Sequence, residues 1–365
     1  MKIVSTSYVN TREFTDPEQW LGRIDFYTGI LEELSQQHTV ESIEQVNYTG
    51  MLERKGVKYN FLDFKRSTTY FPWRLHSFIK KLKPNVVLVN GFIFPLQIIQ
   101  LRLKLGKAVK IIVLHRGEKP YRGIKGRLQK MADKMVNAYL FTSVAFGKEW
   151  TTFGNISSQH KIYESIQASS VFYPQDRTLS RSGLQINGDP VFLWVGRLNN
   201  NKDPLTVVKA FLAFVELRPG AELYMIYQTE ELLNEIKELI QECKSSETIK
   251  LVGKVPHLKM QNWYNAADFI ISGSHHEGSG IAVCEAMSCG CVPVITDIIS
   301  FQKMTGHPVC GLLYEPGNDR ALLKTLLRTP ELDMEKERTK TIQQFKEELS
   351  FEAIAKKINK VINSC

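Results

Sequence analysis

Short apolar runs alternate with amphipathic helical patterns along the whole of this 365-residue chain. Segments such as TGILEELSQQ from Thr28 and GRLQKMADKMVNA from Gly126 have helical periodicity, whereas the apolar runs predict strands. The runs lie at 2–7, 40–46, 61–64, 86–90, 109–115 and 138–142, and then at 191–195, 222–226, 249–252, 269–272, 292–296 and 311–314. The alternation indicates two βαβ series, each forming a doubly wound parallel sheet.

The two series are separated by a polar stretch rich in turn residues, PQDRTLSRSGLQINGDP from Pro174. We expect an N-terminal Rossmann-like domain over 1–175, a linker over 176–188 and a C-terminal Rossmann-like domain over 189–345. An amphipathic helix over 346–365 closes the chain and could pack back on the first domain. Because ligands bind beyond the carboxyl ends of parallel strands, two facing α/β domains would enclose a cleft between those ends.

Composition is that of a folded globular chain, with 43% hydrophobic and 23% charged residues. No run of 18 apolar residues occurs, and MKIVSTSYVN at the start is typical of a first strand rather than a signal peptide. We therefore expect a cytoplasmic location. The six cysteines all lie in the second half without a CxxC pair, which argues against zinc ribbons and redox motifs and favours small buried side chains.

Positive charge is concentrated in residues 51–150, which contain 21 lysines and arginines and 5 acidic residues, a net charge of +16. The densest stretch, KRSTTYFPWRLHSFIKKLK from Lys65, interleaves basic and aromatic residues, which favours an anionic membrane surface. The alternative is a solvated helix with its aromatic residues packed inward, because Leu75, Phe78, Ile79 and Leu82 recur at helical spacing. Nucleic acid is disfavoured as a partner, since no nucleic-acid-binding signature is found.

The stretch HHEGSGIAVCEAM, residues 275–287, predicts a glycine-rich turn that leads from a strand into a helix. Free amide groups at the helix start, around Gly280, can meet an anion such as phosphate. Glu277 on the turn and Glu285 in the helix are suited to accepting hydrogen bonds from sugar hydroxyls. His275 and His276 are metal-ligand types, but neighbours in an extended segment point to opposite sides, so no metal site is expected.

A second group of residues follows the first strand of the second domain, in VFLWVGRLNNNKDP from Val191. Arg197 comes at the strand end, and Lys202 comes just before a helix start marked by Asp203 and Pro204. An arginine fork and a lysine point charge together suit a diphosphate. The alternative for each cation alone is an exposed loop residue.

These residues resemble the family 4 retaining glycosyltransferases, which have the GT-B fold of two facing Rossmann-like domains. The resemblance rests on VGRLNNNKDP and SHHEGSGIAVCEAMSCGCVPVITD, in which Glu277 and Glu285 match the family's E-x7-E motif, and it covers roughly residues 190–320. In the first domain it is weaker: Gly22 stands alone where paired glycines are usual after the first strand. In the second domain, YQTEE from Tyr227 replaces a usual glycine-rich turn.

The resemblance implies that the N-terminal domain is the acceptor side and that the C-terminal domain binds the nucleotide sugar, and it implies roles residue by residue. Arg197 and Lys202 would hold the donor diphosphate, Glu285 the ribose hydroxyls, and Val255 would line the base pocket. Glu277 and the backbone of Gly278, Ser279, Gly280 and Ile281 would hold the donor sugar. His115, at a strand end in the first domain, would face the transferred sugar.

The predicted function is therefore a retaining, metal-independent hexosyltransferase without a cofactor, for which a nucleoside-diphosphate sugar of the UDP or GDP type is the substrate. The expected acceptor is a glycan or lipid-linked saccharide, in surface polysaccharide synthesis at the inner face of the membrane. Two alternatives stay open. One is a nucleotide-sugar epimerase or phosphorylase on the same fold, and the other is a catalytically silent partner subunit.

Overall fold

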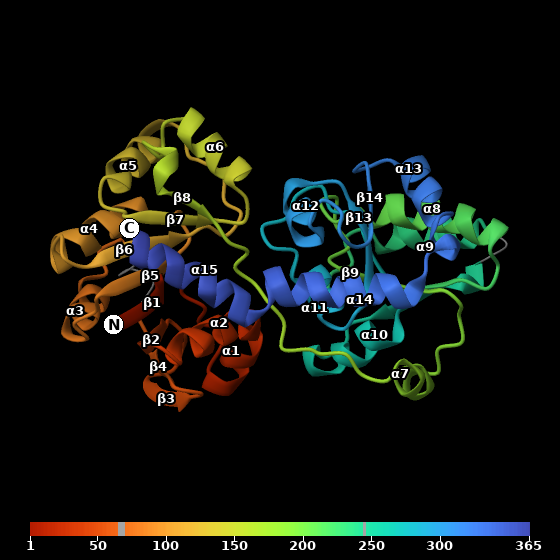
Figure 1. The fold of residues 1–365 in the computed structure, drawn as a ribbon, viewed down its shortest axis with the longest axis horizontal. Coiled ribbons are helices and arrows are strands. Elements are labelled where there is room, and N and C mark those ends of the chain that lie inside the picture. The colour runs from red at the N-terminus through yellow and green to blue at the C-terminus, as the bar shows by residue number, and fades with distance from the viewer. Residues whose placement is uncertain (65–69, 244–245) are drawn as a thin grey trace. The chain divides into compact units, whose positions relative to one another are not determined.

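The computed structural model describes residues 1–64, 70–243 and 246–365, and these form two compact units. One unit comprises Met1–Ser169 with Phe351–Cys365, and the other comprises Ser170–Ser350. Each unit is a sheet of mainly parallel strands with helices on both faces (Figure 1). The predicted pair of Rossmann-like α/β domains is confirmed.

Within the described residues, the N-terminal unit holds an eight-stranded sheet in the order β3-β4-β2-β1-β5-β6-β7-β8. All neighbouring strands are parallel except β3 and β4. The strands are β1 (Lys2–Ser7), β2 (Thr39–Glu44), β3 (Gly50–Arg54), β4 (Val57–Phe61), β5 (Val86–Asn90), β6 (Lys110–Leu114), β7 (Ala138–Phe141) and β8 (Ile162–Glu164).

Two apolar layers enclose this sheet, because successive strand residues point to opposite faces. Ile3 packs with α1, α2 and α15, whereas Val4 packs with α3, α4 and α5. The helices of the unit are α1 (Pro17–Arg23), α2 (Asp25–Ser35), α3 (Trp73–Lys81), α4 (Pro95–Leu105), α5 (Gly123–Asp133), α6 (Val144–Thr152) and α15 (Phe351–Ser364).

The last helix, α15, belongs to the N-terminal unit although the whole C-terminal unit precedes it in sequence. Its apolar stripe, including Ile354, Ile358 and Ile362, is buried in the same cluster as Ile30 and Leu34 of α2. Lys110 Nζ also donates to the carbonyl of Ile362 at 2.7 Å. The amphipathic pattern of this helix is therefore used to cover one face of the first sheet.

Within the described residues, the C-terminal unit holds a six-stranded parallel sheet in the order β11-β10-β9-β12-β13-β14. The strands are β9 (Val191–Gly196), β10 (Glu222–Tyr227), β11 (Ile249–Gly253), β12 (Phe269–Ser272), β13 (Val292–Thr296) and β14 (Leu312–Tyr314). The helices are α7 (Arg177–Leu184), α8 (Pro204–Leu217), α9 (Leu233–Gln241), α10 (Met260–Ala266), α11 (Ile281–Ser288), α12 (Ile299–Thr305), α13 (Asp319–Leu326) and α14 (Met334–Gln344).

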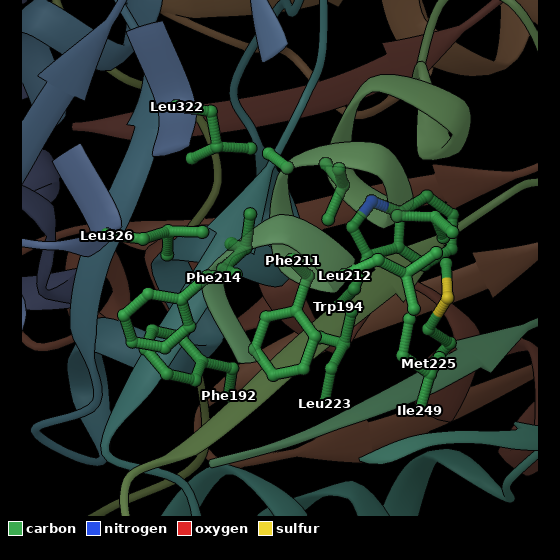
Figure 2. Packing of buried hydrophobic residues seen from close by; sticks show 14 of the residues in the cluster. Phe192, Trp194, Phe211, Leu212, Phe214, Leu223, Met225, Ile249, Leu322 and Leu326 are labelled. Atoms are coloured by element: carbon green, nitrogen blue, oxygen red, sulfur yellow. The ribbon is translucent and has the colours of Figure 1, made fainter. Parts of the chain in front are cut away.

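One face of this second sheet is covered by α8, α9 and α13 (Figure 2). Phe192 of β9 stacks on Phe269 of β12 with ring centres 5.0 Å apart, and its edge meets Phe211 and Phe214 of α8. The near-continuous burial of β9, β12 and β13 explains why they appear in the sequence as unbroken apolar runs. This rigid layer fixes the strand ends at which the candidate site lies.

Two features differ from the sequence expectation. The strand predicted at 61–64 lies instead at Val57–Phe61, where it pairs antiparallel with Gly50–Arg54 across a turn at Lys55 and Gly56, both with positive φ. Gly50–Arg54 alternates half-buried and exposed positions, so it forms no apolar run in the sequence and the hairpin was not predicted. Residues expected as linker contain α7, which packs against α10 within the C-terminal unit.

Four of the six cysteines, Cys284, Cys289, Cys291 and Cys310, are buried and unbridged, which agrees with their expected role as small apolar side chains. Burial raises the pKa of each of these thiols. None of the helices in the described parts of the chain combines the length and apolar character that crossing a bilayer requires.

Candidate functional site

Two loops meet at the carboxyl edge of the C-terminal sheet. The 197–203 loop follows β9, and the 273–280 turn follows β12. His275 N–H donates to the carbonyl of Asn201 at 2.8 Å, and the Asn201 side chain donates to the carbonyl of His276 at 3.0 Å. Gly273 permits this approach, because a Cβ there would lie 2.7 Å from the carbonyl oxygen of Asp203.

Lys202 and Glu277 form an ion pair between these loops, with Lys202 Nζ bonded to Glu277 Oε1. Asp203 begins α8, where its side chain accepts from Thr206 N–H at 3.2 Å. The other oxygen of the Asp203 carboxyl lies 3.1 Å from His275 Nε2. His275 thus serves to join the two loops, and two of the predicted site residues, Lys202 and Glu277, are brought into contact.

The helix that follows the turn, α11, begins at Gly280 with φ of +54°. A side chain at Gly280 would meet the Phe301 ring at 2.7 Å, so the tight turn requires glycine. The N-cap residue of α11 (Ile281–Ser288) is Gly280, which has no side chain with which to cap the helix start. Its first amide groups, from Ile281 onward, have no acceptor within the helix and carry the positive end of the helix dipole. Lys202 and this helix start both lie at the same strand edge.

Glu285, in α11, is 6% exposed and has two hydrogen-bond partners from other elements. Tyr264 of α10 donates to Oε2 at 2.7 Å, and His257 Nε2 lies 2.7 Å from Oε1. Burial, with the Glu285 charge as a further cause, raises the pKa of Tyr264 well above its usual value. The His257 ring is 5.0 Å from the ring of Phe172, so it is held on two sides.

The remaining predicted residues have separate positions. Arg197 is exposed immediately after β9, and Val255 is half-buried in the loop after β11, two residues before His257. His115 lies in the N-terminal unit, where it is 3% exposed and stacked on Phe141 with ring centres 4.2 Å apart.

The contacts of His115 fix the loop that follows β6. Gly117 N–H approaches His115 Nδ1 at 3.3 Å, so Nε2 is the ring nitrogen that carries the proton and donates to the carbonyl of Glu118 at 2.7 Å. The structure therefore shows that His115 holds the loop after β6. Contact of His115 with a transferred sugar stays a prediction.

Sequence reasoning missed Tyr264 and His257 as partners of Glu285. They precede Glu285 by 21 and 28 residues, and neither belongs to the glycine-rich motif. The sequence did indicate that Glu285 lies in an apolar helix. A buried carboxylate there needs hydrogen-bond donors from other elements. Within the described residues, no three histidine, cysteine or acidic side chains are grouped so that they could hold a metal ion.

Comparison with known proteins finds a family match in the C-terminal unit, where this geometry lies. Residues 176–348 match the model of the glycosyl transferases group 1 family. One relative is a D-inositol 3-phosphate glycosyltransferase of Thermobispora bispora, 24% identical over 174 residues, which are 44% of this chain and 41% of the relative. Another is an alpha-monoglucosyldiacylglycerol synthase of Streptococcus pneumoniae, 26% identical over 157 residues, 42% of this chain and 35% of the relative.

The aligned part of the chain therefore spans less than half the length of these relatives. A similar solved structure, HepE from Anabaena in complex with UDP and glucose, has a TM-score of 0.72 at 14% identity and is covered completely, as is this chain. The chain has the GT-B fold, and its C-terminal unit carries the group 1 glycosyltransferase match.

Proposed function

We propose that this chain is a retaining glycosyltransferase that moves a hexosyl group from a nucleoside-diphosphate sugar to a glycan or lipid-linked saccharide. The observation that carries the proposal is the joining of Lys202 to Glu277 at the same strand edge as the start of α11, whose N-cap residue is a glycine. A cation and free amide groups suit a diphosphate, and the adjacent carboxylate suits sugar hydroxyls. Glu285, anchored by Tyr264, is suited to a ribose.

The proposed reaction breaks the bond between the anomeric carbon and the diphosphate oxygen, and the electron pair leaves with the diphosphate. Lys202, Arg197 and the α11 amides stabilise the charge that develops there. The acceptor hydroxyl attacks the same face of the sugar, and its proton passes to the departing phosphate oxygen. Glu277 orients the donor sugar through its hydroxyls, so no protein nucleophile is required.

The names of the relatives support this substrate class. HepE was solved with UDP and glucose, and the Streptococcus pneumoniae relative is named for a glucosylated diacylglycerol. A nucleotide-sugar donor and a lipid-linked or surface-glycan acceptor are consistent with these names. The alternatives on the same fold, an epimerase, a phosphorylase or a silent subunit, make different products or none.

The test begins with a thermal-shift screen of UDP- and GDP-sugars, because a ligand at 100 times its Kd stabilises a protein by about 2.7 kcal/mol. The stabilising sugar is then incubated with candidate acceptors in the presence of EDTA, and the anomeric configuration of the product is read by NMR. A new glycoside of the donor's own configuration supports the proposal. An epimerised nucleotide sugar, a free sugar phosphate or no turnover counts against it.

We also propose that the N-terminal unit meets an anionic lipid surface through the start of α3. Tyr70, Phe71 and Trp73 are 69%, 58% and 57% exposed, while Leu75 and Ile79 of the same segment are buried. Residues 65–69 of the basic stretch lie outside the described residues. The helix that begins with Trp73 ends with Lys80 and Lys81, which are also exposed, and exposed aromatic and basic side chains on one element are the combination that favours a bilayer interface.

A further inference from the structure

A cavity of about 310 Å³ lies at the carboxyl edge of the N-terminal sheet, where β1, β2 and β5 end. Its walls are largely apolar and include Trp20, Ile24, Phe26 and Ile43. This volume is at the lower end of the range for small-ligand sites, so the cavity suits one sugar-sized group. Aromatic and aliphatic walls pack well against the C–H faces of a saccharide ring.

Arg116, which follows β6, is the cation that lines this cavity. Its guanidinium lies over the Tyr27 ring, 4.6 Å from the ring centre. It donates to the carbonyl of Gln167 at 2.7 Å and to the side-chain oxygen of Asn90. Both acceptors are uncharged, and they use two of the five N–H donors of the side chain.

The two carboxyl groups that line the cavity are committed to other donors. Glu118 accepts from Phe92 N–H at 2.9 Å and from Arg116 N–H at 2.5 Å, both of them backbone groups. Glu44 accepts from the Trp20 indole at 2.9 Å and from Ser42 at 2.5 Å. Burial raises the pKa of Glu44, which weakens it as a counter-charge.

Arg116 is therefore a half-buried cation with no ion pair among the described residues. Its partial burial lowers the pKa of this guanidinium, although interactions with Tyr27 and Glu118 oppose the effect. Charges that are withdrawn from water are normally paired, because desolvation is costly. Guanidinium donors that lie in a cavity, with only neutral acceptors, are well placed to bind an oxyanion.

We propose that this cavity is the acceptor site and that it selects a saccharide bearing an oxyanion, phosphate or carboxylate, recognised by Arg116. The inference rests on the proposed glycosyl transfer, because it assigns the cavity to the second substrate. Trp20 and Phe26 would pack on the sugar ring. The oxyanion would lie at Arg116, and the hydroxyl that accepts the glycosyl group would lie away from that end of the saccharide.

The test measures binding to the whole chain by isothermal titration calorimetry. The probes are α-D-glucose 1-phosphate, D-glucuronate and methyl α-D-glucopyranoside, which compare a phosphate, a carboxylate and no charge on similar rings. We expect the two anionic sugars to bind at least tenfold more tightly than the neutral one. Their ratio tells which oxyanion the site prefers. Equal binding of the neutral sugar, or no binding of any probe, overturns the proposal.

Variants locate the binding. Arg116→Gln should weaken the anionic sugars by roughly ten- to a hundredfold and leave the neutral one unchanged, since a hydrogen bond to a charged group is lost. Arg122→Gln removes an equal charge from an exposed position and should change nothing. Wild-type affinity in Arg116→Gln would overturn the proposal, and the charge preference of the wild type tests it even if that variant does not fold.

Two further arms separate this inference from the proposed function. Lys202→Ala should retain full binding of glucose 1-phosphate, because the cavity lies in the other unit; loss of that binding would assign the probe to the donor site instead and overturn the inference. Turnover of nucleotide sugars is measured separately. If no glycoside forms while Arg116-dependent binding persists, it is the proposed transferase activity that fails, and the cavity remains an oxyanion site.

Discussion

At the scale of single residues, the two glutamates of the motif have different surroundings. Glu277 is paired with a cation, Lys202, on a loop. Glu285 is buried and held by the hydroxyl of Tyr264 and the ring of His257. In the proposed reaction, Lys202 would exchange its carboxylate for phosphate oxygens when a donor binds, whereas Glu285 is already held in place by Tyr264 and His257.

Lys202→Ala tests the first of these residues. It should lower kcat/KM for the nucleotide sugar by roughly ten- to a hundredfold, because a hydrogen bond to a charged group contributes about 1.5 to 3 kcal/mol. Steady-state kinetics on the donor found by the thermal-shift screen measures this. The matched control is Lys209→Ala, an exposed lysine of α8, which should retain wild-type kinetics. Equal rates in both variants would remove Lys202 from the mechanism.

Tyr264→Phe tests the anchor of Glu285. Because it leaves a buried carboxylate oxygen without its donor, the free energy of unfolding should fall by about 1 to 3 kcal/mol. The Michaelis constant for the donor should rise as well, since Glu285 loses its fixed orientation. Urea denaturation and kinetics together check this prediction. A drop in stability with an unchanged Michaelis constant would show that Tyr264 serves only the fold.

Sequence reasoning reached part of this site. Lys202 was predicted to follow the first strand of the second domain and Glu277 to lie on a glycine-rich strand-to-helix turn, and ligands bind at the carboxyl ends of such strands. The partners of Glu285 could not be predicted, since their contact depends on how α10 packs against α11. The ion pair between Lys202 and Glu277 was likewise not predicted.

At the scale of elements, α3 docks on the sheet through a buried histidine. His76 is fully buried, and its Nε2 lies 3.0 Å from the Tyr8 hydroxyl. Burial, with a smaller contribution from the Lys104 charge, lowers the pKa of His76 to about 4. Docking of α3 is therefore coupled to the neutral form of the imidazole.

This coupling predicts an acid-sensitive contribution to stability. In the unfolded chain histidine has a pKa of about 6.5, so between about pH 6.5 and pH 4 the His76 imidazole binds a proton in the unfolded chain but not in the folded chain. The free energy of unfolding therefore decreases as pH falls from about 6.5 to about 4. The full effect is about 3 kcal/mol. Urea denaturation at pH values across this window should show a steeper loss for the wild type than for His76→Gln. Parallel curves for the two proteins would contradict the prediction.

The contact between α2 and α15 depends on a glycine. A Cβ on Gly29 would lie 2.6 Å from ring atoms of Phe351, so Gly29→Ala forces the ring away and should cost about 1 kcal/mol. Gly22→Ala in α1 is the control, because nothing lies within 4 Å and alanine favours helix by up to about 1 kcal/mol. In a Phe351→Ala background the cost of Gly29→Ala should vanish. Persistence of the cost there would place the strain elsewhere.

Elements with strong periodicity were predicted well, and the reasons for the exceptions are local. The buried parallel strands β1 and β5 match their predicted bounds. Burial on both faces leaves the apolar run VVLV in β5, whereas β1 buries Ser5 and Thr6 together with Ile3 and Val4. β3 alternates half-buried and exposed positions at the sheet edge, so its apolar signal is weak. α7, in the expected linker, is a short amphipathic helix whose pattern is mostly polar.

At the scale of the whole molecule, the positive charge of residues 51–150 divides into an internal and an external part. Arg102 is buried and donates to the carbonyls of Met135, Gly106 and Val109, so it serves the fold. Lys110 binds α15, and Arg116 lines the cavity of the N-terminal unit. The net charge of residues 51–150 therefore overstates the positive charge that a partner can contact. Exposed lysines such as Lys80, Lys81 and Lys83, at or just after the end of the helix that begins with the exposed Trp73, remain available.

The membrane prediction follows from this external part. Reversing Lys80, Lys81 and Lys83 to Glu should abolish co-sedimentation with anionic vesicles, since each basic residue near such a surface contributes about 1 kcal/mol, and high salt should do the same to the wild type. Trp73→Ala should weaken binding at any salt concentration, because it removes apolar contact rather than charge. The control reverses three exposed lysines of the C-terminal unit, Lys209, Lys237 and Lys254. If the control loses binding equally, attraction follows total charge and not this surface. Binding that ignores both salt and charge reversal would mean that the basic segment is a solvated face without a lipid partner.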